Sequence, residues 1–152
     1  LIQRTQPGTA FQSGGSSLGW GLGAALGAKL AAPERTVVAL VGDGAFIFGC
    51  PTSALWAADV YKAPFLTVIF NNQRYHAPLA SLQQGYGRDS YSERTGWVGI
   101  DIAPPPDYAL LAQACRAYGE TVAEPDQVLP ALRRGLERVR AGQAAVLDVL
   151  IS

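Results

Sequence analysis

A glycine-flanked aspartate and a pair of asparagines constrain the fold of this chain more than any other feature. Gly42-Asp43-Gly44 follows an apolar run at residues 36–41, and Asn71-Asn72 follows a second run at residues 65–70, with 26 residues between the two motifs. We expect both runs to be β-strands joined by a crossover helix. Such a unit brings the carboxyl ends of two parallel strands to one sheet edge, about 5 Å apart if the strands are neighbours. Asp43 and the asparagines are therefore predicted to converge in the crevice where open α/β sheets bind ligands.

The residue types at this edge are those that bind hard cations. A carboxylate, an amide oxygen and backbone carbonyls suit Mg²⁺, which takes about six oxygen ligands and often shares them with phosphate. Gly42 and Gly44 allow a close backbone approach, and a crossover helix starting shortly after Gly44 would direct N–H groups at an anion. The pattern favours a diphosphate bridged to Mg²⁺. The alternative is a strand-to-helix turn with Asp43 as N-cap and an Asn-Asn turn.

At these residues the chain resembles the thiamine-diphosphate enzymes of the acetohydroxyacid synthase and benzoylformate decarboxylase group. Their cofactor motif is Gly-Asp-Gly, about 25 residues, then Asn-Asn. The resemblance extends to the glycine-rich segment 13–27, the turn at 32–35, and segments 53–58 and 71–76. It implies an α/β fold with three layers, α/β/α, and a mostly parallel sheet. It also implies that residues 1–152 are one diphosphate-binding domain, the last domain of a three-domain enzyme.

The resemblance also implies a set of metal ligands. Asp43 is expected to be the charged Mg²⁺ ligand, Asn72 the side-chain amide ligand, and the main-chain carbonyl of Arg74 the third. Because that third ligand is backbone, the side chain at Arg74 need not matter. Asn71 is interpreted as a structural turn residue.

Further residues are expected to contact thiamine diphosphate. Leu18 matches the bulky residue that holds the cofactor bent, although core packing is the alternative. His76, the only histidine, either acts as an acid or base or hydrogen-bonds within its loop. Ala45 stands where many relatives carry Ser, and retains its backbone N–H for phosphate. The full expected set of cofactor contacts is Ser16 (by its carbonyl), Leu18, Gly42, Asp43, Gly44, Ala45, Asn72, and the N–H groups of Tyr75, His76 and Ala77.

Composition argues against several other classes of function. Twelve basic residues balance twelve acidic ones, and there is no basic stripe of the kind that binds nucleic acid. No apolar run reaches about 18 residues, so we expect no membrane span. Cys50 and Cys115 lack motif spacing and are predicted to be reduced thiols of a cytoplasmic protein. The chain begins at Leu1 and contains no methionine, from which we expect a fragment.

The rest of the chain is predicted from periodicity and breakers. We expect a glycine-rich helix that packs closely on backbone or cofactor, and a long irregular segment that borders the substrate entrance in the resembling enzymes. The predicted helices are 18–30, 52–61, a short one near 78–84, one from an Asp107 cap to residue 118 with Tyr108 on its apolar side, and 125–141; the predicted strands are 36–41, 65–70, 120–123 and 145–151.

Three functions compete at this point. The first is an acetolactate-synthase-like lyase or transferase acting on 2-oxo acids, and the second is a decarboxylase of aromatic or branched 2-oxo acids. In the resembling enzymes the catalytic Glu comes from the first domain of a partner subunit, so we expect no catalytic residue here, a homodimer or homotetramer, and an inactive isolated domain. Pro78 replaces the Glu of pyruvate decarboxylases. The third function is a non-catalytic nucleotide-binding or assembly module.

Overall fold

One parallel sheet organises the molecule. The computed structural model describes residues 5–15, 17–87 and 90–151. The described strands pair in the order β1-β2-β4-β3, all parallel. Their bounds are β1 Val38–Gly42, β2 Leu66–Asn71, β3 Tyr118–Val122 and β4 Ala145–Leu150. The two strands that precede the paired motif are direct neighbours, as predicted, with Gly42 opposite Phe70 at their carboxyl ends.

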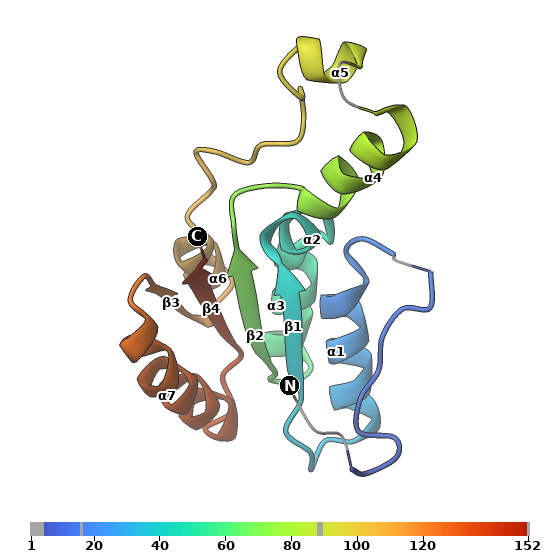
Figure 1. Cartoon of the computed structure of the whole chain (residues 1–152). Coiled ribbons are helices and arrows are strands. Elements are labelled where there is room, and N and C mark those ends of the chain that lie inside the picture. The colour runs from blue at the N-terminus through green and yellow to red at the C-terminus, as the bar shows by residue number, and fades with distance from the viewer. Residues whose placement is uncertain (1–4, 16, 88–89, 152) are drawn as a thin grey trace.

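Helices cover both faces of this sheet (Figure 1). On one face lie α1 (Trp20–Ala31), α3 (Pro51–Val60) and α6 (Tyr108–Ala114), and on the other lies α7 (Val128–Arg140). The short α2 (Asp43–Phe48) adds Phe46 to the core of the first face. The predicted three-layer α/β/α architecture is confirmed. The largest buried side chains of the first core are Leu22, Phe46, Leu55, Phe65, Ile69 and Tyr108, and the second core includes Leu66, Val68, Ala131 and Leu147.

The strands differ in how completely they are covered. β2 is buried along both faces except at Phe70, as expected for an apolar central strand. β1 lies at the edge of the sheet and buries only alternate residues, so that Val38 and Leu40 are 45% and 50% exposed. Helix α7 packs against β2, β3 and β4. Among the described residues, β1 is therefore covered on one face only.

Glycines let α1 and its N-cap residue pack closely on neighbouring elements, as the sequence predicted. A Cβ on Gly21 would lie 2.7 Å from Cγ1 of Val41, and one on Gly19 would lie 2.7 Å from Cα of Gly49. Gly19 has a φ of 87°, which only glycine adopts readily, and the helix begins at the next residue. The helix therefore starts two residues later than predicted.

The crossover contains two helices rather than the single one that was predicted. α2 begins at Asp43, immediately after β1, and ends at Phe48, while α3 begins at Pro51. Cys50 between them has a φ of 49°. Because a residue before proline is sterically kept out of the right-handed helical region, the helix breaks here. The helix was expected to start after Gly44, and this expectation is corrected: Asp43 is itself the first helical residue.

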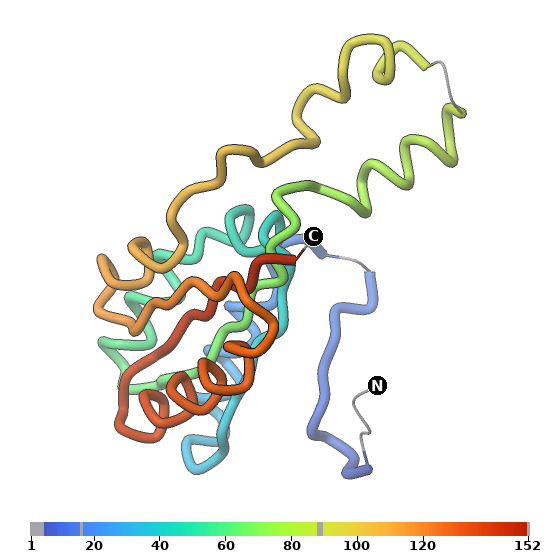
Figure 2. The backbone as a smooth tube through the Cα atoms, turned by 60° about the vertical axis from the view of Figure 1, so that its left-hand side comes forward, coloured from blue at the N-terminus to red at the C-terminus, as the bar shows by residue number. Residues whose placement is uncertain are grey.

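The segment after β2 forms an arm that projects from the sheet (Figure 2). It contains α4 (His76–Tyr86), longer than the short helix predicted, and α5 (Tyr91–Arg94). Its two ends pair with each other: Tyr75 N donates to Ile100 O at 2.8 Å, and Ile102 N donates to Gln73 O at 2.8 Å. We call this pairing of residues 73–75 with 100–102 the neck. Leu79 is the only buried residue of α4, so the arm has little contact with the body of the protein.

Smaller differences concern the second half of the chain. Helix α6 ends at Ala114, earlier than predicted, because Arg116 takes a φ of 62° and the chain reverses into β3. Strand β3 consequently starts at Tyr118 rather than at residue 120. The last predicted helix begins as a 3₁₀ turn, Pro125–Gln127, and continues as α7.

Candidate functional site

The carboxyl ends of β1 and β2 bring the two motifs to one edge of the sheet. Asp43 follows β1 directly and is 2% exposed, and Asn71 ends β2 and is 1% exposed. Asn72 comes next and is exposed. The predicted convergence of the two loop tips therefore holds for the backbone.

Asp43 is the most unusual group at this edge. Its Oδ2 atom is buried and has no hydrogen-bond partner among the described residues. A buried carboxylate oxygen without a donor is strongly disfavoured unless a cation or another donor compensates it. The residue that the sequence assigned to a divalent cation thus has an uncompensated acceptor. Asp43 therefore fits a role in binding a cation.

Gly44 is required for steric reasons. A Cβ at this position would lie 2.5 Å from two ring carbons of Tyr75 and 3.4 Å from Cδ1 of Ile102. The neck of the arm therefore packs directly on the Gly-Asp-Gly turn. The sequence assigned only a backbone N–H to Tyr75, and its ring contact with Gly44 was not predicted.

Asn71 has the structural role that the sequence assigned to it. Its Nδ2 donates to Oδ1 of Asp148 at 2.9 Å, and its Oδ1 accepts from Gln73 N at 3.1 Å. Burial raises the pKa of Asp148, the Asn71 hydrogen bond opposes that rise, and the charges of Asp43 and Asp107 add to it. The sequence analysis did not single out Asp148. Its signal was a lone acidic residue within the apolar strand Ala145–Leu150.

The other two expected metal ligands have oxygens that already accept hydrogen bonds. Oδ1 of Asn72 accepts from Arg74 N at 3.2 Å, and the Arg74 carbonyl accepts from His76 N at 2.9 Å. The Arg74 side chain points elsewhere and pairs with Asp101 at 2.6 Å. Each of these oxygens has a second lone pair. Metal binding by Asn72 and Arg74 stays a prediction.

The structure bears in different ways on the residues that were expected to contact the cofactor. The Tyr75 and His76 N–H groups are donated to Ile100 and Arg74 carbonyls, so the structure does not support their assignment to phosphate. Ala77 lies in the first turn of α4, and Ala45 in the first turn of α2. Leu18 is 41% exposed, which contradicts its alternative role in core packing. Ser16 lies outside the described residues.

Tyr108 is a buried polar residue that the sequence assigned only to an apolar helix face. It is fully buried, and its ring meets that of Phe46 edge-on, with centroids 5.4 Å apart. Its hydroxyl has no partner among the described residues. Burial, followed by the negative charges of Asp43 and Asp148, raises the pKa of Tyr108 to about 12. The hydroxyl is therefore protonated, and it lies within electrostatic reach of the two acidic residues.

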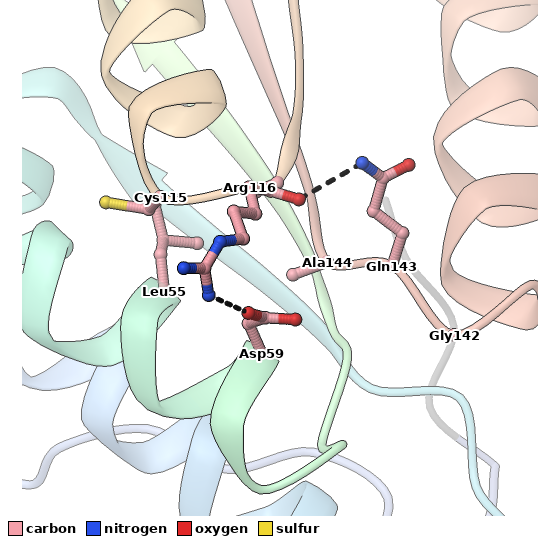
Figure 3. A pocket seen from close by; sticks show the side chains of 8 residues that line it. Leu55, Asp59, Cys115, Arg116, Gly142, Gln143 and Ala144 are labelled. Carbon is pink, nitrogen blue, oxygen red and sulfur yellow. Dashed lines mark hydrogen bonds and ion pairs between the residues drawn. The ribbon is translucent and has the colours of Figure 1, made fainter.

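A small polar cavity of about 70 Å³ lies at the opposite, amino-terminal end of the sheet (Figure 3). Arg116 Nη1 binds Oδ2 of Asp59 at 2.8 Å across it, and Gln143 Nε2 donates to the Arg116 carbonyl at 3.1 Å. Hydrogen bonds from Arg116 and Lys62 lower the pKa of Asp59. None of the predicted site residues lines this cavity, whose charges satisfy one another.

Two absences among the described residues bear on the type of site. They contain no group of three or more His, Cys, Asp and Glu side chains that could hold a metal ion. The expected ligand set has a single carboxylate and would not form such a group. Within the same residues, no helix combines the length and apolar character needed to cross a membrane.

Comparisons with known proteins agree with the resemblance seen in the motifs. The family model described as "Thiamine pyrophosphate enzyme, C-terminal TPP binding domain" matches residues 1–149. Sulfoacetaldehyde acetyltransferase of Rhodobacter capsulatus is 33% identical over 135 residues, covering 88% of this chain and 21% of that protein. The large subunit of acetolactate synthase isozyme 2 of Escherichia coli is 33% identical over 132 residues, covering 86% of this chain and 22% of that protein.

A solved structure supports the same relationship. The thiamine diphosphate-dependent 4-hydroxybenzoylformate decarboxylase of Rhodococcus jostii RHA1 superposes with a TM-score of 0.63 at 31% identity. The match covers 88% of this chain and 23% of that one. This chain thus spans less than a quarter of the length of these three relatives.

Proposed function

The chain belongs to the family of C-terminal, TPP-binding domains of thiamine pyrophosphate enzymes, and from this membership we propose that it binds thiamine diphosphate through Mg²⁺ at the carboxyl ends of β1 and β2. The observation that carries the proposal is the buried Asp43 Oδ2 atom, which has no donor among the described residues. A divalent cation would compensate this carboxylate. The second loop tip, with Asn72, lies on the neighbouring strand.

The residues of the chain have separate tasks in this proposal. Asp43 supplies the charged ligand, and Asn72 and the Arg74 carbonyl supply neutral oxygens. Gly44 has no side chain, so the Tyr75 ring can pack directly against the turn. Leu18, which is largely exposed beside α1, is the apolar side chain available to the cofactor rings. When bound, thiamine diphosphate supplies an ylid carbon and an electron sink for bonds next to a carbonyl.

The activity of the whole protein follows from its relatives and is part of the proposal. Acetolactate synthases and decarboxylases such as benzoylformate decarboxylase of Pseudomonas aeruginosa are among them. We propose a lyase or transferase that acts on 2-oxo acids in the manner of acetolactate synthase; the second candidate is a decarboxylase of aromatic or branched 2-oxo acids. Product analysis of the natural full-length protein, with pyruvate and with benzoylformate, separates the two.

The catalytic Glu is proposed to come from another domain, on a partner subunit. Glu120 is held by Arg134 and Tyr118 at the β3 edge and is not free to act. The protein is therefore proposed to be a homodimer or homotetramer. Exposed Trp20 beside a groove of about 610 Å³ between α1 and α3 favours association. Light scattering on the purified full-length protein tests this, and a monomer at micromolar concentration would contradict it.

Isothermal calorimetry tests the cofactor proposal. We expect thiamine diphosphate to give a binding heat that depends on Mg²⁺, and expect Asp43→Ala to abolish it because the charged ligand is lost. Asp59→Ala is the matched control, since Asp59 is a carboxylate at the opposite end of the sheet. Binding that persists unchanged in Asp43→Ala would refute the proposed site.

A further inference from the structure

Three buried side-chain oxygen atoms have no partner among the described residues: Oδ2 of Asp43, the hydroxyl oxygen of Tyr108 and Oγ1 of Thr67 on β2. Oδ2 of Asp43 is an acceptor, and the two hydroxyl groups are donors. Native proteins rarely leave such groups unpaired, and an unpaired group therefore needs an explanation.

The packing places Tyr108 against the helix that carries Asp43. The Tyr108 ring meets Phe46 edge-on, at an interplanar angle of 77°. Phe46 lies about one helical turn after Asp43 on α2 and belongs to the same core as Tyr108. The charge of Asp43 also acts on the Tyr108 hydroxyl and helps to raise its pKa. The ring contact with Phe46 and the effect of the Asp43 charge thus both place Tyr108 near Asp43.

The two loop tips differ in how their side chains are fixed. At the β2 tip, Asn71 is anchored from two sides, by Asp148 and by Gln73 N. At the β1 tip, the Oδ2 atom of Asp43 has no such anchor among the described residues. A metal ligand that can rotate freely binds its ion less well than one held by a second hydrogen bond. The β1 tip therefore lacks one partner. Of the two buried hydroxyl groups without a partner, that of Tyr108 belongs to the ring that packs on Phe46 of α2, the helix that carries Asp43.

We propose that Tyr108 is a positioning residue, whose hydroxyl donates through one buried water to Oδ2 of Asp43 and so orients the carboxylate toward a divalent cation. This inference rests on the proposed function, because it gives Asp43 a metal to bind. The hydroxyl does not touch the cation or the cofactor. A carboxylate oxygen has more than one lone pair, so Oδ2 can accept this hydrogen bond and still bind the ion. Buried water commonly links such pairs.

The test compares two matched tyrosine variants of the natural full-length protein. Tyr108→Phe removes only the proposed donor and keeps the ring that packs on Phe46. Tyr118→Phe removes a hydroxyl that donates to Glu120 at 2.6 Å, at the β3 edge. For each protein, calorimetry gives the Mg²⁺ dissociation constant at saturating thiamine diphosphate. Thermal unfolding without Mg²⁺ and without cofactor gives the stability of the bare protein.

We expect Tyr108→Phe to raise the Mg²⁺ dissociation constant about tenfold, as loss of a group that orients a metal ligand does. Its unfolding temperature without metal should fall, because the buried Asp43 carboxylate loses its donor. Tyr118→Phe should also lower the unfolding temperature, but it should leave the dissociation constant unchanged. A purely structural Tyr108 would alter the unfolding temperature and leave Mg²⁺ binding unchanged.

The outcomes separate this inference from the proposed function. If the wild-type protein binds Mg²⁺ with the cofactor and Tyr108→Phe binds it equally well, the positioning role is overturned and the site stands. If the wild-type protein shows no Mg²⁺-dependent binding, the proposed function is overturned, and the role of Tyr108 with it.

Discussion

At the scale of single residues, the space beside Gly44 decides which side chains can replace this glycine of the Gly-Asp-Gly motif. Its backbone is helical, so the constraint is the Tyr75 ring, 2.5 Å from where a Cβ would stand. The sequence analysis explained this glycine by a close backbone approach. The structure instead explains it by a side chain 31 positions along the chain, a contact that no local pattern contains.

Gly44→Ala should destabilise the protein by about 1–3 kcal/mol, because the added methyl must displace the Tyr75 ring. Gly23→Ala is the matched control: Gly23 lies inside α1 and has open space at its Cβ position. That substitution should stabilise the helix by up to about 1 kcal/mol. Urea unfolding of both variants measures the difference. Equal unfolding free energies for the two variants would contradict the packing described at Gly44.

The two asparagines of the second motif should separate stability from binding. Asn71→Ala leaves the buried Asp148 without its donor, and we expect a loss of about 2 kcal/mol of unfolding free energy. Asn72 is exposed, so Asn72→Ala should change stability by less than about 0.5 kcal/mol and should weaken Mg²⁺ binding. Urea unfolding and calorimetry measure the two effects. A larger stability loss in Asn72→Ala than in Asn71→Ala would reverse the assigned roles.

At the scale of elements, charged side chains attach the edge strand β3 to α7. Arg134 reaches Glu120 through both its Nε and Nη2 atoms, and Arg138 stacks over the Tyr118 ring at 5.1 Å. Their partners lie on another element, and composition along one helix cannot identify them.

This network predicts that the unfolding free energy of the protein depends on pH. The Arg134 hydrogen bond, followed by that of Tyr118, lowers the pKa of Glu120 below its ordinary 4.5, despite partial burial. A lowered folded-state pKa stabilises the protein above the unfolded pKa, and this stabilisation is lost as the pH falls through the folded pKa. Glu120→Gln should therefore be less stable than wild type at pH 7, by up to about 1 kcal/mol.

The difference between the two proteins should shrink as the pH falls below about 4.5. Urea unfolding at several pH values tests this, with Glu137→Gln, at an exposed position of α7, as the control. A difference between wild type and Glu120→Gln that grows on acidification would contradict the sign of the shift.

The elements themselves were largely predictable. Apolar runs identified all four described strands to within two residues, and Asp107 was correctly placed as the cap of α6, where its side chain accepts from Leu110 N. The division of the crossover into α2 and α3 was not predicted, although Pro51 was a signal in the sequence for a break before it. The neck was missed for another reason, since it joins residues 73–75 to 100–102 across an arm that has little hydrophobic periodicity.

At the scale of the whole molecule, the sheet topology was predictable from the sequence. The side chains that are buried beneath the sheet edge were not. A right-handed crossover between parallel strands left few arrangements open, so the meeting of the two motifs followed from the sequence. Which side chains lie under that edge depends on α6 and β4, which arrive from distant parts of the chain. Tyr108 and Asp148 therefore had no local signal that linked them to Asp43.

The central claim is that Asp43 and Asn72 bind one divalent cation that carries a diphosphate. A crystal structure of the full-length protein grown with thiamine diphosphate and Mn²⁺ tests it most directly, because Mn²⁺ is located by its anomalous scattering. We expect a single metal peak about 2.0–2.3 Å from both the Asp43 carboxylate and the Asn72 amide oxygen, with diphosphate oxygens completing its shell. A metal peak elsewhere, with these two side chains turned away from it, would contradict the account.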